Sequence, residues 1–432
     1  MTPDRPGEAP DLLVVVGSGP AGAAAARVLA RAGADVVLLT AEPEPPYDRT
    51  HLSKQVLGPD GADPDPLWDA TEDWRHRVDL RTGCRVEHLD TAARCVSAAG
   101  GERIRYSRLL LATGAAPRRL GLPGDDGPGV HHLRDLADAR RLEAHLGTAH
   151  RLVIIGGGLI GLEVAAAAVS RGLDVHVLEA GPRVLGRGVP EAVATAVAAR
   201  HTVAGVRIST GVLPAGIERG PDRGPAAVRL ADGTLVPADA VVVGVGAVPR
   251  DDLAAAAGLT VDDGVVVDTS CRTSAENVWA AGDAVRMLAG HAAGHDAGSG
   301  GRGVRLETFT DAQRQGETAA AAMLGEPVRY ADACYAWSDQ YDLTVSSIGL
   351  APPDIGAVAL DLPDAVVVLA VDGPTLHAVT VAGAAAATGR LVALARHCVT
   401  RRAPVDVAEI RAAQDLAGLT RTLRAAVKAL GP

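Results

Sequence analysis

Two glycine fingerprints for dinucleotides constrain this chain more than any other feature. The first reads Gly-Ser-Gly-Pro-Ala-Gly at 17–22, and the second reads Gly-Gly-Gly-Leu-Ile-Gly at 156–161. Each follows a run of β-branched residues and precedes an alanine-rich stretch, which is the pattern of a strand, a tight turn and a helix. The glycines permit the turn, the close approach of a pyrophosphate and the packing of helix on strand. Two such sites predict a chain that holds two dinucleotides and passes a hydride between them.

Composition excludes several other classes of protein. The 432 residues are 47% hydrophobic and 22% charged, which predicts a globular chain of about two to four domains. Because no apolar run reaches about 18 residues, we expect no membrane span, and the polar segment 1–11 does not resemble a signal peptide. We therefore expect a cytoplasmic protein. The net charge of −10 and the aromatic content of 2% argue against nucleic acid as a partner.

Four further segments carry a family resemblance, and they occur in the family's order. They resemble segments of the FAD-dependent ferredoxin reductases of the putidaredoxin reductase, rhodocoxin reductase and biphenyl-dioxygenase reductase type, which share the pyridine nucleotide-disulfide oxidoreductase fold without its redox cysteines. The segments are Pro-Tyr-Asp-Arg-Thr-His-Leu-Ser-Lys at 46–54, Ala-Ala-Gly-Asp at 280–283, Arg-Gln-Gly at 314–316 and Trp-Ser-Asp-Gln-Tyr at 337–341. Two stretches depart from the family pattern, at 50–51 and at 334–336, and these departures leave the electron acceptor open.

The resemblance implies a domain plan and a reaction. We expect an α/β fold with two Rossmann-like dinucleotide-binding domains and a C-terminal α+β interface domain. The FAD domain comprises 1–113 and 247–327, the NAD domain 114–246 and the C-terminal domain 328–432, with an amphipathic helix at about 405–430. The implied reaction passes a hydride from NADH to FAD and then single electrons to an iron–sulfur ferredoxin, which serves a P450 or a Rieske oxygenase. We expect a monomer or a homodimer.

Three residues are the candidates for chemistry by this resemblance. Lys54 lies near the flavin in the family and pairs with the acid that follows the second fingerprint, here Glu163. A buried ammonium would stabilise negative charge on the reduced flavin, and the carboxylate would offset its desolvation. Trp337 is expected beside the flavin or on the route to the acceptor. The alternatives are a solvated lysine, an ordinary acid at a helix start and a tryptophan of the core.

The coenzyme contacts follow from the fingerprints and the resemblance. Glu179 ends the second strand of the NAD unit, where a carboxylate binds a ribose hydroxyl and repels a 2′-phosphate, so we predict NADH over NADPH. Arg183 and Arg187 lie close enough in sequence to weaken that preference. The remaining expected nicotinamide-side residues are Gly156, Gly158, Leu159, Ile160, Gly161 and Gly246. The expected flavin-side residues are Gly17, Gly19, Ala21, Gly22, Glu42, Arg49, Lys54, Val86, Thr113, Gly114, Arg134, Gly282, Asp283 and Phe309.

Other functions remain open from the sequence. Thiol–disulfide reductases and NADH oxidases of this fold need a redox cysteine after the first ribose-binding strand, but the segment 47–57 contains none and no Cys-x-x-Cys pair occurs. His291 and His295 lie in a glycine-rich stretch without an evident third ligand, so we expect no metal. Two alternatives are kept: a flavoenzyme of the same fold that acts directly on a small molecule, and a flavin-binding docking protein with little turnover.

Overall fold

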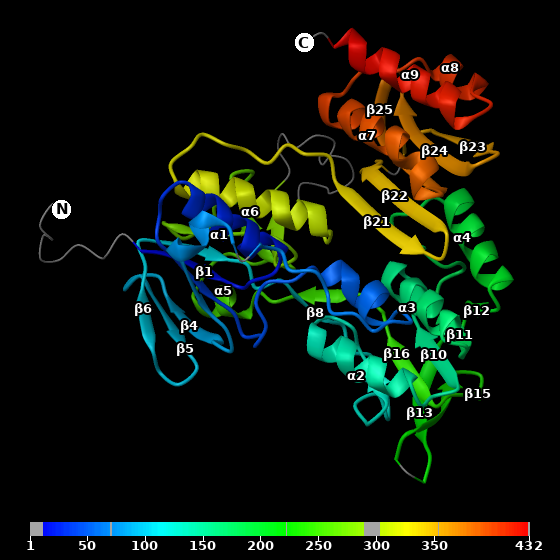
Figure 1. Ribbon diagram of the computed structural model, residues 1–432, viewed down its shortest axis with the longest axis horizontal. Coiled ribbons are helices and arrows are strands. Elements are labelled where there is room, and N and C mark those ends of the chain that lie inside the picture. The colour runs from blue at the N-terminus through cyan, green and yellow to red at the C-terminus, as the bar shows by residue number, and fades with distance from the viewer. Residues whose placement is uncertain (1–11, 70, 222, 289–302, 353, 431–432) are drawn as a thin grey trace, which may run out of the picture. The chain divides into compact units, whose positions relative to one another are not determined.

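The computed structural model describes residues 12–69, 71–221, 223–288, 303–352 and 354–430. The chain divides into two compact units, each assembled from three stretches (Figure 1). Unit 1 comprises Met1–Asp48, Asp65–Ala116 and Val248–Cys334, and unit 2 comprises Arg49–Pro64, Pro117–Ala247 and Tyr335–Pro432. Among the described residues, no helix has the length and apolar character needed to cross a membrane. His291 and His295 lie outside the described ranges.

Unit 1 is built on a parallel sheet of five strands in the order β19-β7-β1-β2-β3. Its inner strands are apolar along their whole length and buried, as expected where helices cover both faces of a parallel sheet. The sheet strands are β1 (Leu13–Val16), β2 (Val36–Leu39), β3 (Val78–Arg81), β7 (Arg108–Leu111) and β19 (Val278–Ala280). The helices are α1 (Pro20–Arg31), η3 (Asp73–Arg77), α5 (Asp252–Ala256) and α6 (Phe309–Met323).

Smaller sheets complete unit 1. An antiparallel sheet of three strands is inserted between β3 and β7, and two short parallel strands precede α6. Helices α1 and α6 pack so closely that a Cβ at Gly316 would lie only 2.1 Å from the carbonyl oxygen of Ala21. The absence of a side chain at Gly316 permits this approach. The smaller strands are β4 (Val86–Asp90), β5 (Cys95–Ala98), β6 (Arg103–Arg105), β18 (Val265–Val267) and β20 (Val285–Met287).

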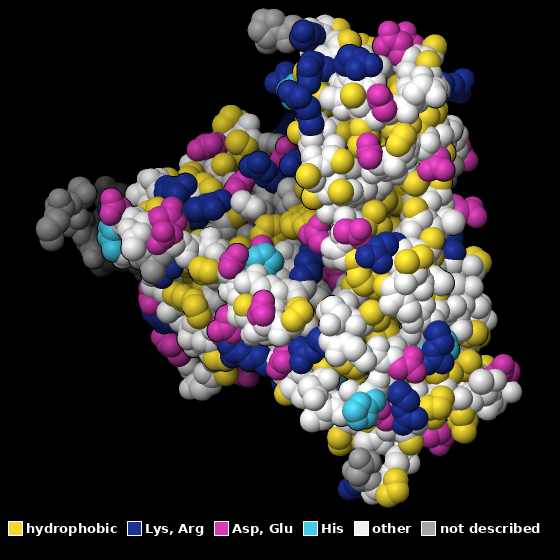
Figure 2. Space-filling view, turned by 45° about the vertical axis from the view of Figure 1, so that its right-hand side comes forward, with side chains coloured by type: hydrophobic (Ala, Val, Ile, Leu, Met, Phe, Trp, Pro, Cys, Tyr) yellow, Lys and Arg dark blue, Asp and Glu magenta, His cyan; other side chains and the backbone are white. Residues whose placement is uncertain are grey.

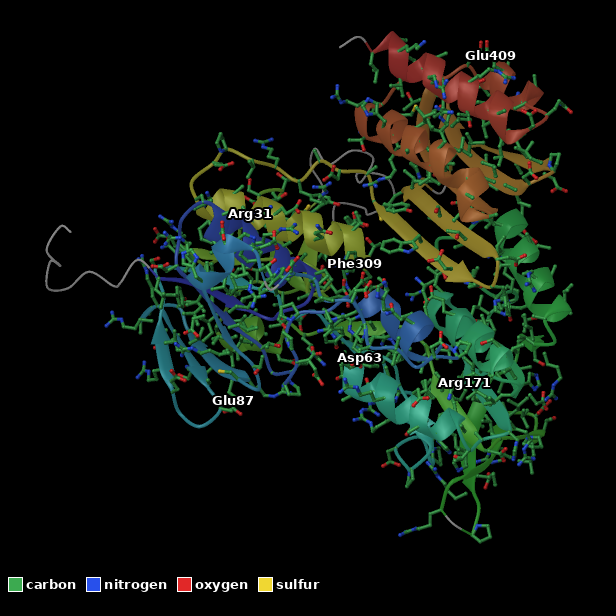
Figure 3. All side chains as sticks on the ribbon, in the orientation of Figure 1. Arg31, Asp63, Glu87, Arg171, Phe309 and Glu409 are labelled. Carbon is green, nitrogen blue, oxygen red and sulfur yellow. The ribbon has the colours of Figure 1, made fainter. Side chains whose placement is uncertain are left out.

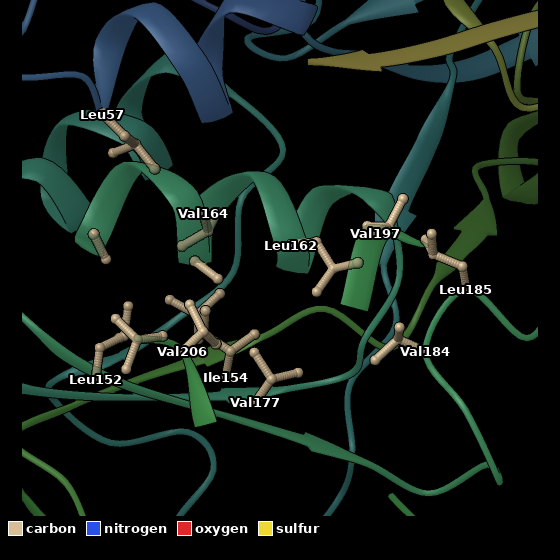
Figure 4. Packing of buried hydrophobic residues seen from close by; sticks show 14 of the residues in the cluster. Leu57, Leu152, Ile154, Leu162, Val164, Val177, Val184, Leu185, Val197 and Val206 are labelled. Carbon is tan, nitrogen blue, oxygen red and sulfur yellow. The ribbon is translucent and has the colours of Figure 1, made fainter. Parts of the chain in front are cut away.

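Unit 2 repeats the parallel design with the strand order β12-β11-β10-β16-β9. Its core, shown in Figure 4, places Leu162 and Val164 of α3 against Ile154 and Val177 of the sheet. The strands are β9 (Val130–His131), β10 (Arg151–Ile155), β11 (Asp174–Glu179), β12 (Arg207–Thr210) and β16 (Ala240–Val243). The helices are α2 (Leu136–Leu146), α3 (Leu159–Ser170) and α4 (Glu191–Val203), and a β-meander follows in β13 (Pro214–Arg219), β14 (Pro225–Leu230) and β15 (Leu235–Pro237). Strands β8 (Ala115–Pro117) and β17 (Ala247–Pro249), in which the chain passes from one unit to the other, form a two-stranded sheet.

The segment at 49–64 belongs to unit 2 because its contacts lie there. It forms a 3₁₀ turn, η1 (Arg49–His51), and a short π-helix, η2 (Leu52–Val56). Asp63 pairs with Arg140 of α2 at 3.0 Å, and the Arg171 guanidinium donates to the carbonyl oxygen of Leu57 at 3.4 Å. The Asp63 and Arg171 side chains are labelled in Figure 3. The same short segment carries Lys54.

The C-terminal part of unit 2 is an antiparallel sheet with helices. Its strand order is β21-β22-β25-β24-β23, and helix α7 packs on β22 and β25. The elements are β21 (Tyr335–Gln340), β22 (Leu343–Gly349), β23 (Ala357–Leu362), β24 (Ala365–Asp372), β25 (Thr375–Gly383), α7 (Ala385–Arg401), α8 (Val407–Ala412) and α9 (Leu416–Ala429). The single helix expected at about 405–430 is wrong. The backbone is extended at Ala413, and the side chain of Asp415 caps a new helix.

These elements confirm the predicted class, an α/β protein with two parallel dinucleotide-type sheets and a C-terminal α+β part. On the face shown in Figure 2, acidic and basic side chains are interspersed.

Candidate functional site

The glycine turn of unit 1 leaves an open helix start. Gly17 has φ +106°, and a Cβ there would lie 2.1 Å from the carbonyl oxygen of Ala112, so only glycine fits. A Cβ at Gly22 would lie 1.8 Å from the Gly17 carbonyl oxygen, which shows how closely α1 approaches β1. Helix α1 begins after Gly19, and no described side chain caps it. Its first N–H groups are therefore available to a pyrophosphate.

Further flavin-side residues surround this turn in unit 1. Glu42 accepts a hydrogen bond of 2.6 Å from the Tyr47 hydroxyl, and the Thr113 hydroxyl donates to the carbonyl oxygen of Arg250 at 2.7 Å. The Gly282 N–H donates to Oε1 of the fully buried Gln315 at 2.8 Å. The Nε2 of Gln315 is also buried and has no hydrogen-bond partner among the described residues. An uncapped helix start and an unused buried donor fit a dinucleotide in this unit.

The other expected flavin-side residues are spread over both units. Ala21 is at the start of α1, Gly114 follows β7, Val86 begins β4, Asp283 follows the turn at Gly282, and Phe309, labelled in Figure 3, begins α6. Arg49 and Arg134 lie in unit 2, where the Arg49 guanidinium donates to the carbonyl oxygen of Arg134 at 3.1 Å. The Arg49 side chain therefore contacts the Arg134 backbone within unit 2.

The glycine turn of unit 2 has the same geometry. Gly156 has φ +107°, and a Cβ there would lie 2.5 Å from the carbonyl oxygen of Gly244. Gly161 approaches the Gly156 carbonyl oxygen in the same way, at 2.3 Å for its added Cβ. A Cβ at Gly158 would meet no atom of the described residues within 4 Å. Helix α3 thus begins beside open space, and no side chain of the described residues caps it. The N–H groups of Leu159 and Ile160 can therefore bind a pyrophosphate.

Glu179 is held in place at the end of β11. Its Oε2 accepts from the Gly157 N–H at 2.8 Å and its Oε1 from the Gly181 N–H at 2.7 Å. Arg183 donates to carbonyl oxygens of its own loop, including those of Leu185 at 3.0 Å and Val189 at 2.9 Å. The Arg183 guanidinium is therefore engaged by the backbone. Arg187 instead lies beside Gly246, where an added Cβ would be 3.3 Å from its Nη2.

The three candidates for chemistry come together within unit 2. The Lys54 ammonium lies 3.6 Å from Oε1 of Glu163 and 3.5 Å from Oδ2 of Asp339. It also lies 5.6 Å from the ring centroid of Trp337, which is within cation–π range. Glu163 is 7% exposed, while the Lys54 side chain is 20% exposed. Three stretches of chain, from η2, α3 and β21, converge to make this group.

Two serines complete the surroundings of Glu163. The Ser53 hydroxyl donates to Oε2 of Glu163, and the Ser338 hydroxyl donates to Oε1 at 2.5 Å. Burial raises the pKa of Glu163 above its usual value, whereas Lys54 and the two hydroxyls oppose that shift. Sequence reasoning did not assign roles to Ser53 and Ser338. The signal available was position alone: Ser53 precedes Lys54, and Ser338 follows Trp337 on the opposite face of β21.

Taken together, the fold and these sites define an α/β protein with two dinucleotide cradles and a lysine paired with a buried glutamate. The model for the pyridine nucleotide-disulphide oxidoreductases matches residues 12–316. The chain belongs to this family, and membership implies binding of FAD and NAD(H).

Curated relatives carry reductase names. The chain is 40% identical over 343 residues to the ferredoxin–NAD(+) reductase component of the anthranilate 1,2-dioxygenase system of Burkholderia cepacia, covering 79% of this chain and 82% of that protein. It is 40% identical over 346 residues to rhodocoxin reductase of Rhodococcus erythropolis, covering 78% of each chain. These relatives confirm the resemblance to ferredoxin reductases.

A solved structure matches over nearly the whole length. The reductase chain in the covalent putidaredoxin reductase–putidaredoxin complex superposes with a TM-score of 0.88 at 31% identity, covering 98% of this chain and 100% of that chain. The match extends through the C-terminal part, beyond the residues of the family model.

Proposed function

We propose that this chain is an FAD-dependent NADH:ferredoxin oxidoreductase. It would accept a hydride from NADH and deliver two electrons, one at a time, to an iron–sulfur ferredoxin that serves a P450 or a Rieske oxygenase, with release of one proton per NADH. FAD supplies the conversion from a two-electron donor to a one-electron acceptor. The observation that carries the proposal is the presence of two uncapped, glycine-lined helix starts in one chain. The relatives' names support ferredoxin as the acceptor.

We assign the roles of the unit 2 group by the family resemblance. Lys54 would place positive charge where the flavin gains negative charge, which favours hydride acceptance. Glu163 would hold the Lys54 ammonium in position, and Trp337 would shield the reaction from water. The distances within the group support this assignment because Glu163 and Trp337 both lie beside the Lys54 ammonium.

We propose NADH as the physiological donor. Both carboxylate oxygens of Glu179 are oriented by backbone N–H groups, so its charge stays where a 2′-phosphate would lie in a Rossmann site. Because Arg183 is engaged by loop carbonyls, it is poorly placed to neutralise such a phosphate. The division into FAD, NAD and C-terminal domains at 113/114, 246/247 and 327/328 also stays a proposal. The use of NADH favours a cytoplasmic location.

The cysteines give no support to a thiol mechanism. All five are unpaired, and burial raises the pKa of Cys84, Cys271 and Cys334, and that of Cys398 to about 11. A redox cysteine needs the opposite shift, toward the thiolate.

The experiment that tests the proposal is an anaerobic titration of the purified protein with NADH, followed by visible absorbance. Bleaching of a bound flavin, and then reduction of an added [2Fe–2S] ferredoxin, is the expected result. Flavin that NADH leaves oxidised would overturn the reductase assignment and favour a docking protein. Bleaching without ferredoxin reduction, but with turnover of a small-molecule acceptor, would favour a flavoenzyme that acts directly on that molecule.

A further inference from the structure

A chain of hydrogen bonds continues from Glu163 into the interior of unit 2. The Ser338 hydroxyl, which donates to Glu163, accepts from Nε2 of Gln340 at 2.9 Å. Oε1 of Gln340 lies 2.8 Å from Nε2 of His201, and Nδ1 of His201 lies 3.1 Å from the Tyr341 hydroxyl. Gln340 is 1% exposed and His201 is fully buried. The chain therefore links the Glu163 carboxylate to α4 without passing through solvent.

The chemistry of the groups gives this chain a direction. An amide nitrogen only donates and an amide oxygen only accepts. Because Gln340 donates to the Ser338 oxygen, the single hydroxyl hydrogen of Ser338 is left for Glu163. Because the Gln340 oxygen needs a donor, His201 must carry its hydrogen on Nε2, and its Nδ1 then accepts from Tyr341. Every donor in the chain points toward the carboxylate.

The far end of the chain is held by a strained residue. Tyr341 has φ +58°, a left-handed conformation that is unfavourable for a tyrosine. Its ring packs edge-on against His201 at 5.1 Å, and the Arg200 guanidinium lies 4.3 Å from its centroid. Arg200 in turn pairs with Asp342 at 2.7 Å. A tyrosine, whose hydroxyl contacts His201, therefore occupies a turn position at which glycine or asparagine is usual.

The charges around the chain favour the same direction. The charged groups that act on Glu163 are Lys54 from η2 and Asp339 from β21, while the facing core residues of β10 and β11 are apolar. Burial lowers the pKa of His201 below its usual value, the hydrogen bond to Gln340 opposes that shift, and nearby Arg200 adds to it, so the net shift favours the neutral ring. A neutral ring with one hydrogen is what the chain requires.

We propose that Gln340 and His201 are positioning residues of the reductase: they orient the Ser338 hydroxyl toward Glu163 and so keep that carboxylate ionised beside Lys54. This inference rests on the proposed function for its catalytic meaning. If the chain were reversed, the Ser338 hydrogen would be drawn to Gln340, and Glu163 would bind Ser338 only as a protonated acid.

The test is an infrared pH titration of the FAD-loaded protein. The protonated carboxyl band of Glu163 is identified by its absence in Glu163→Gln. In His201→Leu the Gln340 amide loses the donor that fixes its orientation, and in Gln340→Leu the residue at 340 can no longer donate to Ser338. We expect both variants to titrate at a pH higher by about one unit, a tenfold change in protonation, because a hydrogen bond to a charged group is weakened. His397→Leu, an exposed position on α7, is the matched control and should titrate as the parent does.

The outcomes separate this inference from the proposed function. A purely structural role of His201 or Gln340 would lower the unfolding midpoint but leave the Glu163 titration in place. Folded, FAD-loaded His201→Leu with the parental titration midpoint would overturn the inference, as would a parent protein in which the carboxyl band persists at every pH. The titration needs no NADH, so a failure of NADH to bleach the flavin tests the proposed function alone. The milder Tyr341→Phe, which removes only the terminal hydroxyl, should shift the midpoint upward by less than His201→Leu does.

Discussion

Glu163→Gln is expected to separate stability from catalysis. Removing one partner of a buried ion pair typically costs about 3–5 kcal/mol, because the other charge is left buried and unpaired. In this variant the Lys54 charge would be neither fully buried nor unpaired, since its side chain is 20% exposed and Asp339 remains 3.5 Å away. The neutral amide also removes the desolvation cost that raises the pKa of Glu163. We therefore expect the free energy of unfolding to change by no more than about 1 kcal/mol.

The catalytic effect should be larger. The variant loses the anion that holds the Lys54 ammonium, so the rate of flavin reduction by NADH should fall at least about tenfold, or about 1.4 kcal/mol in the barrier. Urea unfolding measures the first quantity and anaerobic stopped-flow absorbance the second. Glu143→Gln is the matched control, because Glu143 pairs with Arg171 at 3.0 Å away from this group. It should leave the rate unchanged.

The pH dependence fixes the sign of the stability effect. An acid whose pKa is raised by folding contributes stability at pH values below its pKa in the unfolded chain, which is about 4.5 for a glutamate. That contribution is lost as the pH rises through the pKa of the folded state. The Glu163→Gln protein should therefore gain stability relative to the parent as pH rises. A loss of more than about 3 kcal/mol at neutral pH, or a parental rate of flavin reduction, would refute this reasoning.

Three further predictions concern two helix glycines, Glu179 and His131. Gly316→Ala should destabilise unit 1 and release FAD, since the new Cβ would lie 2.1 Å from the Ala21 carbonyl oxygen. Gly389→Ala, whose Cβ would meet no described atom on α7, should instead raise the unfolding free energy by about 0.5–1 kcal/mol. Urea denaturation of both variants measures the two changes in unfolding free energy. Glu179→Gln should lower the preference for NADH, measured as kcat/KM with NADH divided by kcat/KM with NADPH, at least about tenfold. A variant with the same preference as the parent protein would argue against a role of Glu179 in coenzyme choice. Burial lowers the pKa of His131 to about 4, so between about pH 4 and 6.5 the unfolded chain binds more protons than the folded one. The urea unfolding midpoint should therefore fall as the pH is lowered through this range. His131→Gln should make the midpoint depend less on pH, and an unchanged dependence would count against this explanation.

Local patterns in the sequence were enough to predict the two parallel sheets and their glycine turns. Each turn uses glycines whose roles depend on neighbours within a few residues and one strand, so spacing alone identifies them. The single helix expected at about 405–430 was wrong, because the chain forms two helices there with extended backbone between them at Ala413.

Long-range contacts were beyond the sequence. His201 and Gln340 are 139 positions apart, and nothing in the helical pattern of α4 distinguishes a buried histidine with a partner from an apolar core residue. Likewise, the attachment of the segment 49–64 to unit 2 depends on tertiary bonds such as that from Arg171 to the Leu57 carbonyl oxygen. The pairing of Lys54 with Glu163 was predicted only through the family resemblance.

Strand β21 has a consequence for how such a protein can diverge. Its odd-numbered residues, Tyr335, Trp337 and Asp339, share one face, while the even-numbered Ser338 and Gln340 are buried on the other. Each face therefore carries its own part of the site: Trp337 and Asp339 lie beside the Lys54 ammonium, while Ser338 and Gln340 belong to the hydrogen bonds that reach Glu163. An insertion or deletion of one residue would exchange the two faces at once and destroy both. Over evolutionary time, this strand should therefore keep its length even where neighbouring loops gain or lose residues.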